Sequence, residues 1–186
     1  MRILLLAFGL LCAITTNALS QGLPNPKPSE EHKVLAKEVG TWDCEIRSYF
    51  QGPEQPPTVT KGVETNKLVS GDMYLQTTFT GEIGGRQFEG HSLLGYDPHK
   101  KKYVGTWADN FTVAPSQVTG TYDKELNTFT ALSSVYDEQS KQELKQKQVT
   151  KWEGENKKVF TIYLLLEIGG ETSEIKLMDM TAVRRD

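Results

Sequence analysis

The sequence predicts an all-β protein: an up-and-down antiparallel barrel of about ten strands, preceded by one short helix. After Gly40, polar and apolar residues alternate along most of the chain, as they do in strands with one buried face. Nine clusters of turn-forming residues divide this region into short segments. No segment between them is long enough for the crossover helix that parallel strands require, so we expect antiparallel pairing.

The nine turn clusters are rich in Gly, Pro, Asn and Asp, which tight connections between antiparallel strands use. They lie at residues 51–57, 70–72, 82–85, 96–101, 109–116, 122–127, 136–142, 153–158 and 168–171. A flat sheet of ten sequential strands would leave two edges open to aggregation, and closure into a barrel removes both. A two-sheet sandwich is the alternative, which the short connections disfavour.

The first 20 residues have the pattern of a secretory signal peptide. Arg2 precedes an apolar run from Ile3 to Ile14, which is too short to span a bilayer, and small and polar residues follow. A buried N-terminal helix is the alternative interpretation. We expect a flexible leader over 21–28, a single domain over 29–186, and a secreted or periplasmic protein with no membrane span in its mature chain.

The one predicted helix lies just before the first strand. Ser29 is suited to the N-cap, Glu30 and Glu31 occupy the first turn, and Gly40 closes the far end. A later segment, 140–152, has helical propensity. Its lysines nevertheless fall on one strand face and Leu144, Gln146, Gln148, Thr150 and Trp152 on the other, so we predict a strand there.

Composition and cysteine content exclude several classes of protein. The net charge is −3, from 21 basic and 24 acidic residues, so nothing indicates a nucleic-acid partner. Without the signal peptide only Cys44 remains, which predicts a buried thiol and no internal disulfide. The sequence does not predict an oligomeric state.

The tetrapeptide Val-Gly-Thr-Trp occurs twice, at 39–42 and at 104–107. The flanking residues differ, so this is not a duplicated domain. In the first copy we expect Gly40 to adopt a left-handed conformation and Trp42 to open the first strand. In the second, Tyr103, Gly105 and Trp107 share one strand face, with Gly105 able to admit a neighbouring ring or a ligand.

Gly-Thr-Trp after a short helix, opening a meander of strands, resembles the calycin barrels, which include the lipocalins and fatty-acid-binding proteins. In that group the Trp packs across the closed end near an Arg of the last strand. The resemblance implies that Trp42 packs against Arg184, with Arg185 as the second choice. Such a stacked cation contributes about 1–2 kcal/mol when desolvated.

The resemblance is closest to one exported bacterial family. GTWD followed by FEGHSLLGYDPHKKKYVGTWAD is similar to the domain of unknown function 1579, over roughly Glu38 to Arg184. The family implies a calycin-like barrel and brings no established activity and no known catalytic residues. Within Gly95-Tyr96-Asp97 we expect Asp97 to accept backbone N–H bonds that fix the turn, and Tyr96 to pack its ring there.

The chain contains no recognisable motif for catalysis, metal binding or nucleotide binding. Gly90–Gly95 only approaches a nucleophile elbow at Ser92, so we predict no catalytic residue. His32 and His99 are expected to be exposed. His91 lies mid-strand: on the outer face it has no special role, and on the inner face it can ligate haem. A metal site would need well-spaced ligands, and the set His91, Asp97 and His99 does not provide them. We therefore predict no metal site and no resident cofactor.

Ten strands enclose more room than side chains need to fill. Aromatic side chains with a few polar groups describe an apolar ligand pocket. The candidate lining residues are Tyr74, Phe79, Phe88, Tyr103, Trp107, Phe129, Gln146, Gln148 and Tyr163, with His91 added if it faces inward. We therefore expect a non-catalytic barrel that binds a small apolar molecule. The alternatives are a haem-binding or enzymatic barrel that uses His91, and a structural or interaction domain with a filled core.

Overall fold

The computed structural model describes residues 26–52 and 54–185, and within them the predicted fold is confirmed. Helix α1 (Glu30–Leu35) continues into a short 3-10 turn, η1 (Ala36–Glu38). Ten strands follow: β1 (Gly40–Ser48), β2 (Thr58–Val69), β3 (Tyr74–Ile83), β4 (Arg86–Asp97), β5 (Lys102–Asp109), β6 (Ser116–Asp123), β7 (Thr128–Asp137), β8 (Gln142–Trp152), β9 (Lys157–Ile168) and β10 (Glu171–Arg184).

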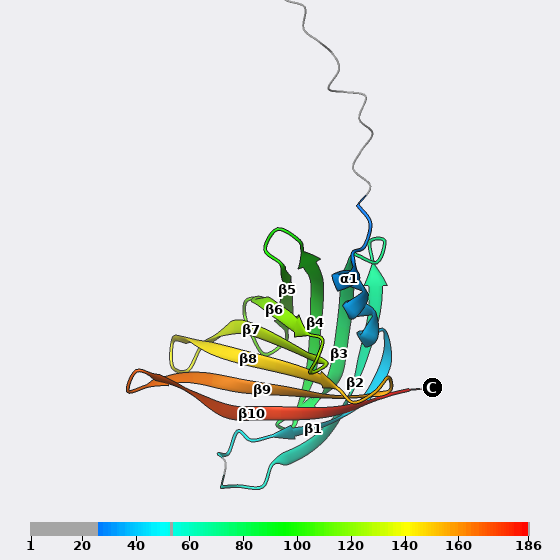
Figure 1. The fold of residues 1–186 in the computed structure, drawn as a ribbon. Coiled ribbons are helices and arrows are strands. Elements are labelled where there is room, and N and C mark those ends of the chain that lie inside the picture. The colour runs from blue at the N-terminus through cyan, green and yellow to red at the C-terminus, as the bar shows by residue number, and fades with distance from the viewer. Residues whose placement is uncertain (1–25, 53, 186) are drawn as a thin grey trace, which may run out of the picture.

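The ten strands form one closed antiparallel barrel in sequential order. Each strand pairs with its neighbours in the chain, and β1 pairs with β10 from Trp42↔Arg184 to Ser48↔Met178. Figure 1 shows these first and last strands side by side. All nine predicted turn clusters fall at connections between strands. The β8 segment is a strand despite its helical propensity, because its inward face packs in the barrel.

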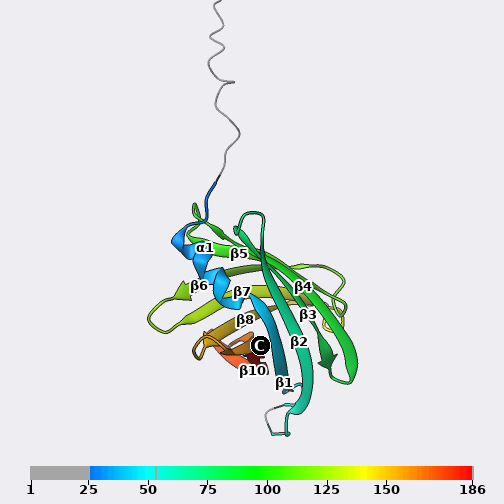
Figure 2. The same ribbon diagram turned by 90° about the vertical axis from the view of Figure 1, so that its right-hand side faces the viewer.

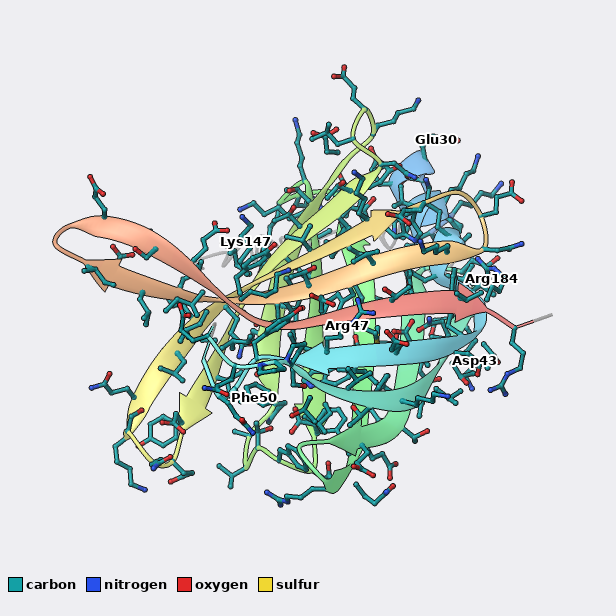
Figure 3. The ribbon with its side chains drawn as sticks, turned by 90° about the horizontal axis from the view of Figure 1, so that it is seen from below. Glu30, Asp43, Arg47, Phe50, Lys147 and Arg184 are labelled. Carbon is teal, nitrogen blue, oxygen red and sulfur yellow. The ribbon has the colours of Figure 1, made fainter. Side chains whose placement is uncertain are left out.

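Antiparallel order places alternate connections at opposite ends of the barrel. One end carries α1, the C-terminus and the β8–β9 connection, and Figure 2 shows α1 lying across it. Leu35 of α1 is buried there against Leu75 and Tyr103. We call this the closed end. The opposite end, formed by the β1–β2, β3–β4 and β5–β6 connections, is the loop end. Figure 3 shows Arg184 and Phe50 at these two ends of the β1–β10 pair.

The N-terminal helix differs from the prediction in one residue. His32 was expected to be exposed, but its side chain is buried at 4% exposure. Its Nδ1 accepts a hydrogen bond from the Ser29 backbone N–H at 3.0 Å, and its ring packs edge-on against Tyr96. The helix lies flat on the barrel end, so this face of α1 is covered.

The predicted signal peptide, residues 1–20, lies outside the described residues, as does most of the leader at 21–28. Those assignments stay predictions. Among the residues that the structure describes, no helix has the length and apolar character needed to cross a bilayer.

Candidate functional site

The barrel interior contains a cavity of about 370 Å³. Inward-facing side chains from most strands line it, and most of them are apolar or aromatic. At the loop end the lining includes Phe50, Ile83 and Phe111, and Phe50 is 60% exposed, so the cavity lining reaches the molecular surface there. At the closed end it includes Leu35 and Trp152, which are buried.

Six of the predicted pocket residues line this cavity: Phe79, Phe88, Trp107, Phe129, Gln146 and Gln148. Tyr103 is also interior, but it lies in the packed layer beneath α1. Its side chain is 3% exposed, and its hydroxyl donates a hydrogen bond to the Glu31 carbonyl at 2.8 Å. Tyr103 therefore anchors the helix on the closed end.

Three candidate pocket residues lie on the outer face of the barrel, so the interior placement of Tyr74 and Tyr163 is wrong and His91 takes the outward of its two expected orientations. Tyr74 faces outward because Leu75 takes the inward position, and its ring covers Gly95. His91 faces outward, where its Nε2 pairs with Glu89 at 2.9 Å. Tyr163 packs beneath the Lys147 ammonium on the outside, since its neighbour Ile162 lines the cavity.

A row of aromatic rings forms one wall of the cavity. Phe88 contacts Phe79 at a centroid distance of 5.9 Å and stacks parallel to Trp107 at 6.3 Å. Phe111 closes on Phe88 edge-to-face at 5.0 Å near the loop end. The glycine that admits the Trp107 ring is Gly90, because a Cβ there would overlap that ring. Gly105 instead faces the Leu93 carbonyl and Leu94, so it does not admit a neighbouring ring as expected.

Asp109 orients the Trp107 side chain and shapes the loop end. One carboxylate oxygen accepts the Trp107 indole N–H at 2.7 Å, and the other accepts the backbone N–H of Phe111 at 2.8 Å and of Thr112 at 2.9 Å. The strand ends here, as the sequence predicts, and the same carboxylate fixes the loop that brings Phe111 over the aromatic wall.

A buried ionic cluster lies at the closed end of the cavity, and sequence reasoning missed it. The Lys158 ammonium donates to Glu64 at 2.6 Å and to Glu38, and its side chain is 3% exposed. Asn66 donates to the same Glu64 carboxylate, and Thr77 donates to Asn66 at 2.6 Å. The signal in the sequence was polar residues at inward positions of β2 and β9, but Lys158 had been assigned to a turn.

Burial and mutual attraction set the ionisation of this cluster. Burial raises the pKa of the Glu38 carboxyl above 4.5, and the nearby negative charge of Glu64 acts in the same direction. The Lys158 ammonium lowers this pKa, but it does not outweigh the effect of burial. Burial alone would lower the pKa of Lys158, but the two carboxylates outweigh it and raise that pKa. Lys158 is therefore protonated at neutral pH, so it is neither a nucleophile nor a general base.

Trp42 forms the base of the cluster and is fully buried. Its indole N–H donates to the Glu38 carbonyl at 2.8 Å, and the Lys158 ammonium lies 4.6 Å from the ring centre. The Arg184 guanidinium covers the ring at 4.1 Å, the contact that the sequence resemblance implied. Arg185 instead pairs with Asp43 on the surface.

Gly40 allows this packing, because its φ is +123° and a Cβ there would lie 2.7 Å from an Arg184 guanidinium nitrogen.

The Gly95-Tyr96-Asp97 segment has the structural role expected of it. Asp97 accepts the backbone N–H groups of His99 at 2.9 Å and Lys100 at 3.1 Å, and these bonds lower the pKa of its carboxyl. The Tyr96 ring packs against Tyr103.

The remaining candidates for chemistry are dispersed. Within residues 26–52 and 54–185, no group of three or more His, Cys, Asp or Glu side chains could hold a metal ion. Cys44 is free and buried, and desolvation, followed by the Glu64 charge, raises the pKa of its thiol to about 12. Its thiol therefore stays protonated at neutral pH and is unreactive.

Comparison with known proteins identifies the family. The sequence pattern of the proteins of unknown function called DUF1579 matches residues 27–184. The chain belongs to this family. No curated protein has significant sequence similarity to this DUF1579 member.

Two solved structures resemble the barrel. The S-type phycobiliprotein lyase CPES from Guillardia theta has a TM-score of 0.53 at 10% identity, over 84% of this chain and 93% of the lyase. A redesigned β-barrel has a TM-score of 0.42 at 12% identity, over 82% of this chain and 96% of that one. At such identities, the likeness to the lyase concerns the fold.

Proposed function

We propose that this DUF1579 barrel binds a small, largely apolar molecule in its interior. The observation that carries the proposal is the cavity of about 370 Å³, lined mainly by apolar and aromatic side chains. Ligand pockets typically measure roughly 300–1,000 Å³ and have such linings. One water molecule occupies only about 30 Å³ in the liquid, so a cavity of this size supports binding of a small molecule over a filled structural core.

The geometry does not support the haem alternative through His91. That imidazole lies on the outer face of β4 and is bonded to Glu89, and the lining contributed by the described residues includes no histidine or cysteine. A haem iron inside the cavity would find no imidazole or thiolate among them. The buried Lys158 is protonated and doubly paired, which favours a binding role over a covalent one.

A fluorescence titration with N-phenylnaphthylamine, a neutral apolar probe, tests the proposal. Ser92 lines the cavity and Leu93, next to it, lies on the outer face at 44% exposure. We expect the Phe side chain of Ser92→Phe to fill part of the cavity. The aromatic rings of the probe then have less room against the cavity lining, so probe binding should weaken at least roughly tenfold. Leu93→Phe is the matched control and should bind the probe as the wild type does.

Circular dichroism verifies that both variants are folded. Native mass spectrometry of the protein purified from its source should in addition show a retained small molecule. Two results together would show that the proposal is wrong. The first is that the probe does not bind the wild type or binds folded Ser92→Phe equally well, and the second is that native mass spectra show only the bare polypeptide.

We also propose that the protein is exported and loses residues 1–20. The charge and apolar pattern of that segment supports this assignment. Mass measurement of the native protein would then give a chain that begins after Ser20, and an intact Met1 would contradict it.

A further inference from the structure

The charged side chains that the described residues contribute to the cavity lining already have partners. They are Glu38, Glu64, Asp109 and Lys158. Lys158 donates to both glutamates at the closed end, and Asp109 accepts the Trp107 indole N–H and two backbone N–H groups at the loop end. An ionised ligand group would lose its hydration here without gaining a free counter-ion, which is costly in a poorly solvated site. The cavity therefore favours a ligand without charge.

Uncharged polar side chains lie together on another part of the cavity wall. Strands β6, β7 and β8 are neighbours in the barrel, and each directs such side chains inward. Ser133 of β7 and Gln146 of β8 are direct cross-strand partners. We call the whole group the polar strip, and its members are Ser116, Ser133, Gln146, Gln148 and Thr150.

Gln146 is the member of the polar strip that has hydrogen-bonding capacity to spare. The Gln148 amide donates to the Ser133 hydroxyl at 3.1 Å, whereas the Gln146 amide has no such partner among the described residues. Gln146 lines the cavity and is only half-buried, so part of its surface stays accessible to a ligand. Its amide offers two N–H donors and one carbonyl acceptor.

A carbonyl oxygen is the ligand group that fits the Gln146 amide best. It accepts a hydrogen bond and carries no donor of its own. The rest of the lining is mainly apolar, so a ligand group with an additional donor would leave that donor unmatched.

The aromatic wall, formed by Phe79, Phe88, Trp107 and Phe111, adjoins the polar strip. Trp107 on β5 and Ser116 on β6 are cross-strand partners, so the two surfaces meet there. The ring planes of Phe88 and Trp107 lie only 15° apart. A flat ring system gains stacking contacts on such a wall and loses less conformational freedom on binding than a flexible chain does. A flat ligand on the aromatic wall therefore has one edge toward the polar strip.

We propose that the cavity selects uncharged, flat aromatic molecules that carry a carbonyl oxygen on one edge. The rings lie on the aromatic wall, and the oxygen accepts a hydrogen bond from the Gln146 amide. This inference rests on the proposed function and adds the chemical class of the ligand and its orientation in the barrel.

Competition between two matched compounds tests the carbonyl. Fluorenone and fluorene share a flat three-ring skeleton and differ in one carbonyl oxygen. Each is titrated against the protein loaded with N-phenylnaphthylamine, below its solubility limit. Burial of apolar surface alone would favour fluorene, the less polar compound. We expect fluorenone to bind at least about fivefold more tightly, because its oxygen accepts the hydrogen bond from Gln146. Equal binding, or tighter binding of fluorene, would overturn the inference.

A second pair of compounds tests the exclusion of charge. Fluorenone-2-carboxamide and fluorenone-2-carboxylate have the same shape, and only the carboxylate is charged at pH 7. We expect the carboxamide to bind at least about tenfold more tightly, because the lining offers the carboxylate no free cation. Equal or tighter binding of the carboxylate would contradict the selection of uncharged ligands.

Two Gln→Leu variants locate the hydrogen bond. Gln146→Leu removes the amide from the polar strip, and we expect it to abolish the preference for fluorenone over fluorene. Gln117→Leu is the matched control, because Gln117 lies exposed on the outer face of β6. It should keep the wild-type preference. Circular dichroism verifies that both variants are folded. A wild-type preference in folded Gln146→Leu would show that the assigned hydrogen bond is wrong.

The role of the aromatic wall is tested with a flexible ketone. Tridecan-7-one has as many carbon atoms as fluorenone and a central carbonyl, but no rings. Phe88→Leu should weaken fluorenone binding at least about threefold more than it weakens tridecan-7-one binding, because only fluorenone stacks on the ring. Equal losses for the two ketones would contradict the selection of flat rings.

The outcomes separate this inference from the proposed function. Failure of the wild type to bind N-phenylnaphthylamine or any of the competing compounds contradicts the proposed function itself. Probe binding without a preference for fluorenone over fluorene contradicts only the ligand class inferred here.

Discussion

Arg184 covers the indole ring of Trp42, with its guanidinium carbon 4.1 Å from the ring centre, and the two residues are also backbone partners where β10 meets β1. The same guanidinium donates to the carbonyls of Lys37 at 2.9 Å, of Glu155 and of Val39. One side chain therefore joins the first strand, the last strand, the 3-10 turn and the β8–β9 connection at the closed end.

Replacing Arg184 by Ala should lower the free energy of unfolding by about 2–4 kcal/mol. The stacked cation accounts for about 1–2 kcal/mol of this, and the bonds to three carbonyls for the rest. Urea unfolding followed by circular dichroism measures the change. Arg185→Ala is the control, since the Arg185 side chain forms an exposed ion pair with Asp43, and its loss should change the free energy of unfolding far less than Arg184→Ala does. Similar losses in both variants would refute the assigned role of Arg184.

Replacing Lys158 by Met should destabilise the protein by about 3–5 kcal/mol, because it leaves the buried carboxylates of Glu38 and Glu64 without their cation. The adjacent Lys157 is the control. It faces outward and pairs with Glu153 at half-exposed positions, so Lys157→Met should cost less than about 1 kcal/mol. Equal urea midpoints for the two variants would show that the buried pairs contribute no more than a surface pair.

The pH dependence of stability should reveal the buried Glu38 carboxyl. Its pKa in the folded protein is raised above 4.5, so between that value and the folded pKa the native state binds more protons than the unfolded state. The contribution of Glu38 to the free energy of unfolding therefore falls as pH rises through this window, by at most about 1.4 kcal/mol per pH unit.

Glu38→Gln removes this contribution, so its stability should fall less steeply with pH than that of the wild type above pH 4.5. Urea titrations at a series of pH values measure both slopes. Glu45→Gln, on the outer face of β1, should retain the wild-type slope. A Glu38→Gln slope identical to that of the wild type would contradict the raised pKa.

Gly90→Ala should destabilise the protein by about 1–3 kcal/mol, because the added Cβ overlaps the Trp107 ring and forces it to move. Trp107 fluorescence should shift as its bond to Asp109 weakens. The test is a double-mutant cycle with Trp107→Leu, in which the smaller side chain relieves the overlap and Gly90→Ala costs less. Additive losses would show that Gly90 is not needed to admit the ring.

The local pattern of the sequence is sufficient to predict the strands and their connections. Alternation identifies each strand, and Gly, Asn and Asp mark the turns, because both properties depend on residues close together in the chain. Even β8, with its helical propensity, follows its alternation. Closure also follows from the sequence, since ten short-linked strands leave two edges that only each other can cover.

Which face of a strand points inward was predicted less well. Alternation shows that two residues share a face, but not which face is buried when both carry apolar side chains. For this reason Tyr163 was misplaced and the face of His91 was left open, since Leu165 and Leu93 lie beside them on the same outer faces. A β-bulge between Lys176 and Met178 also shifts the register of β10 against β9.

The sequence by itself determined the barrel and the aromatic character of its interior, and the resemblance to the calycin barrels implied the closing Trp42–Arg184 contact. Only the tertiary structure decided the polar end of the cavity. Lys158 lies 94 and 120 positions from its partners Glu64 and Glu38, and no local pattern couples residues so far apart. Closure of the barrel brings these residues together at its closed end. Because they are buried there, water does not solvate their charges, and each charge is stabilised by its oppositely charged partner instead.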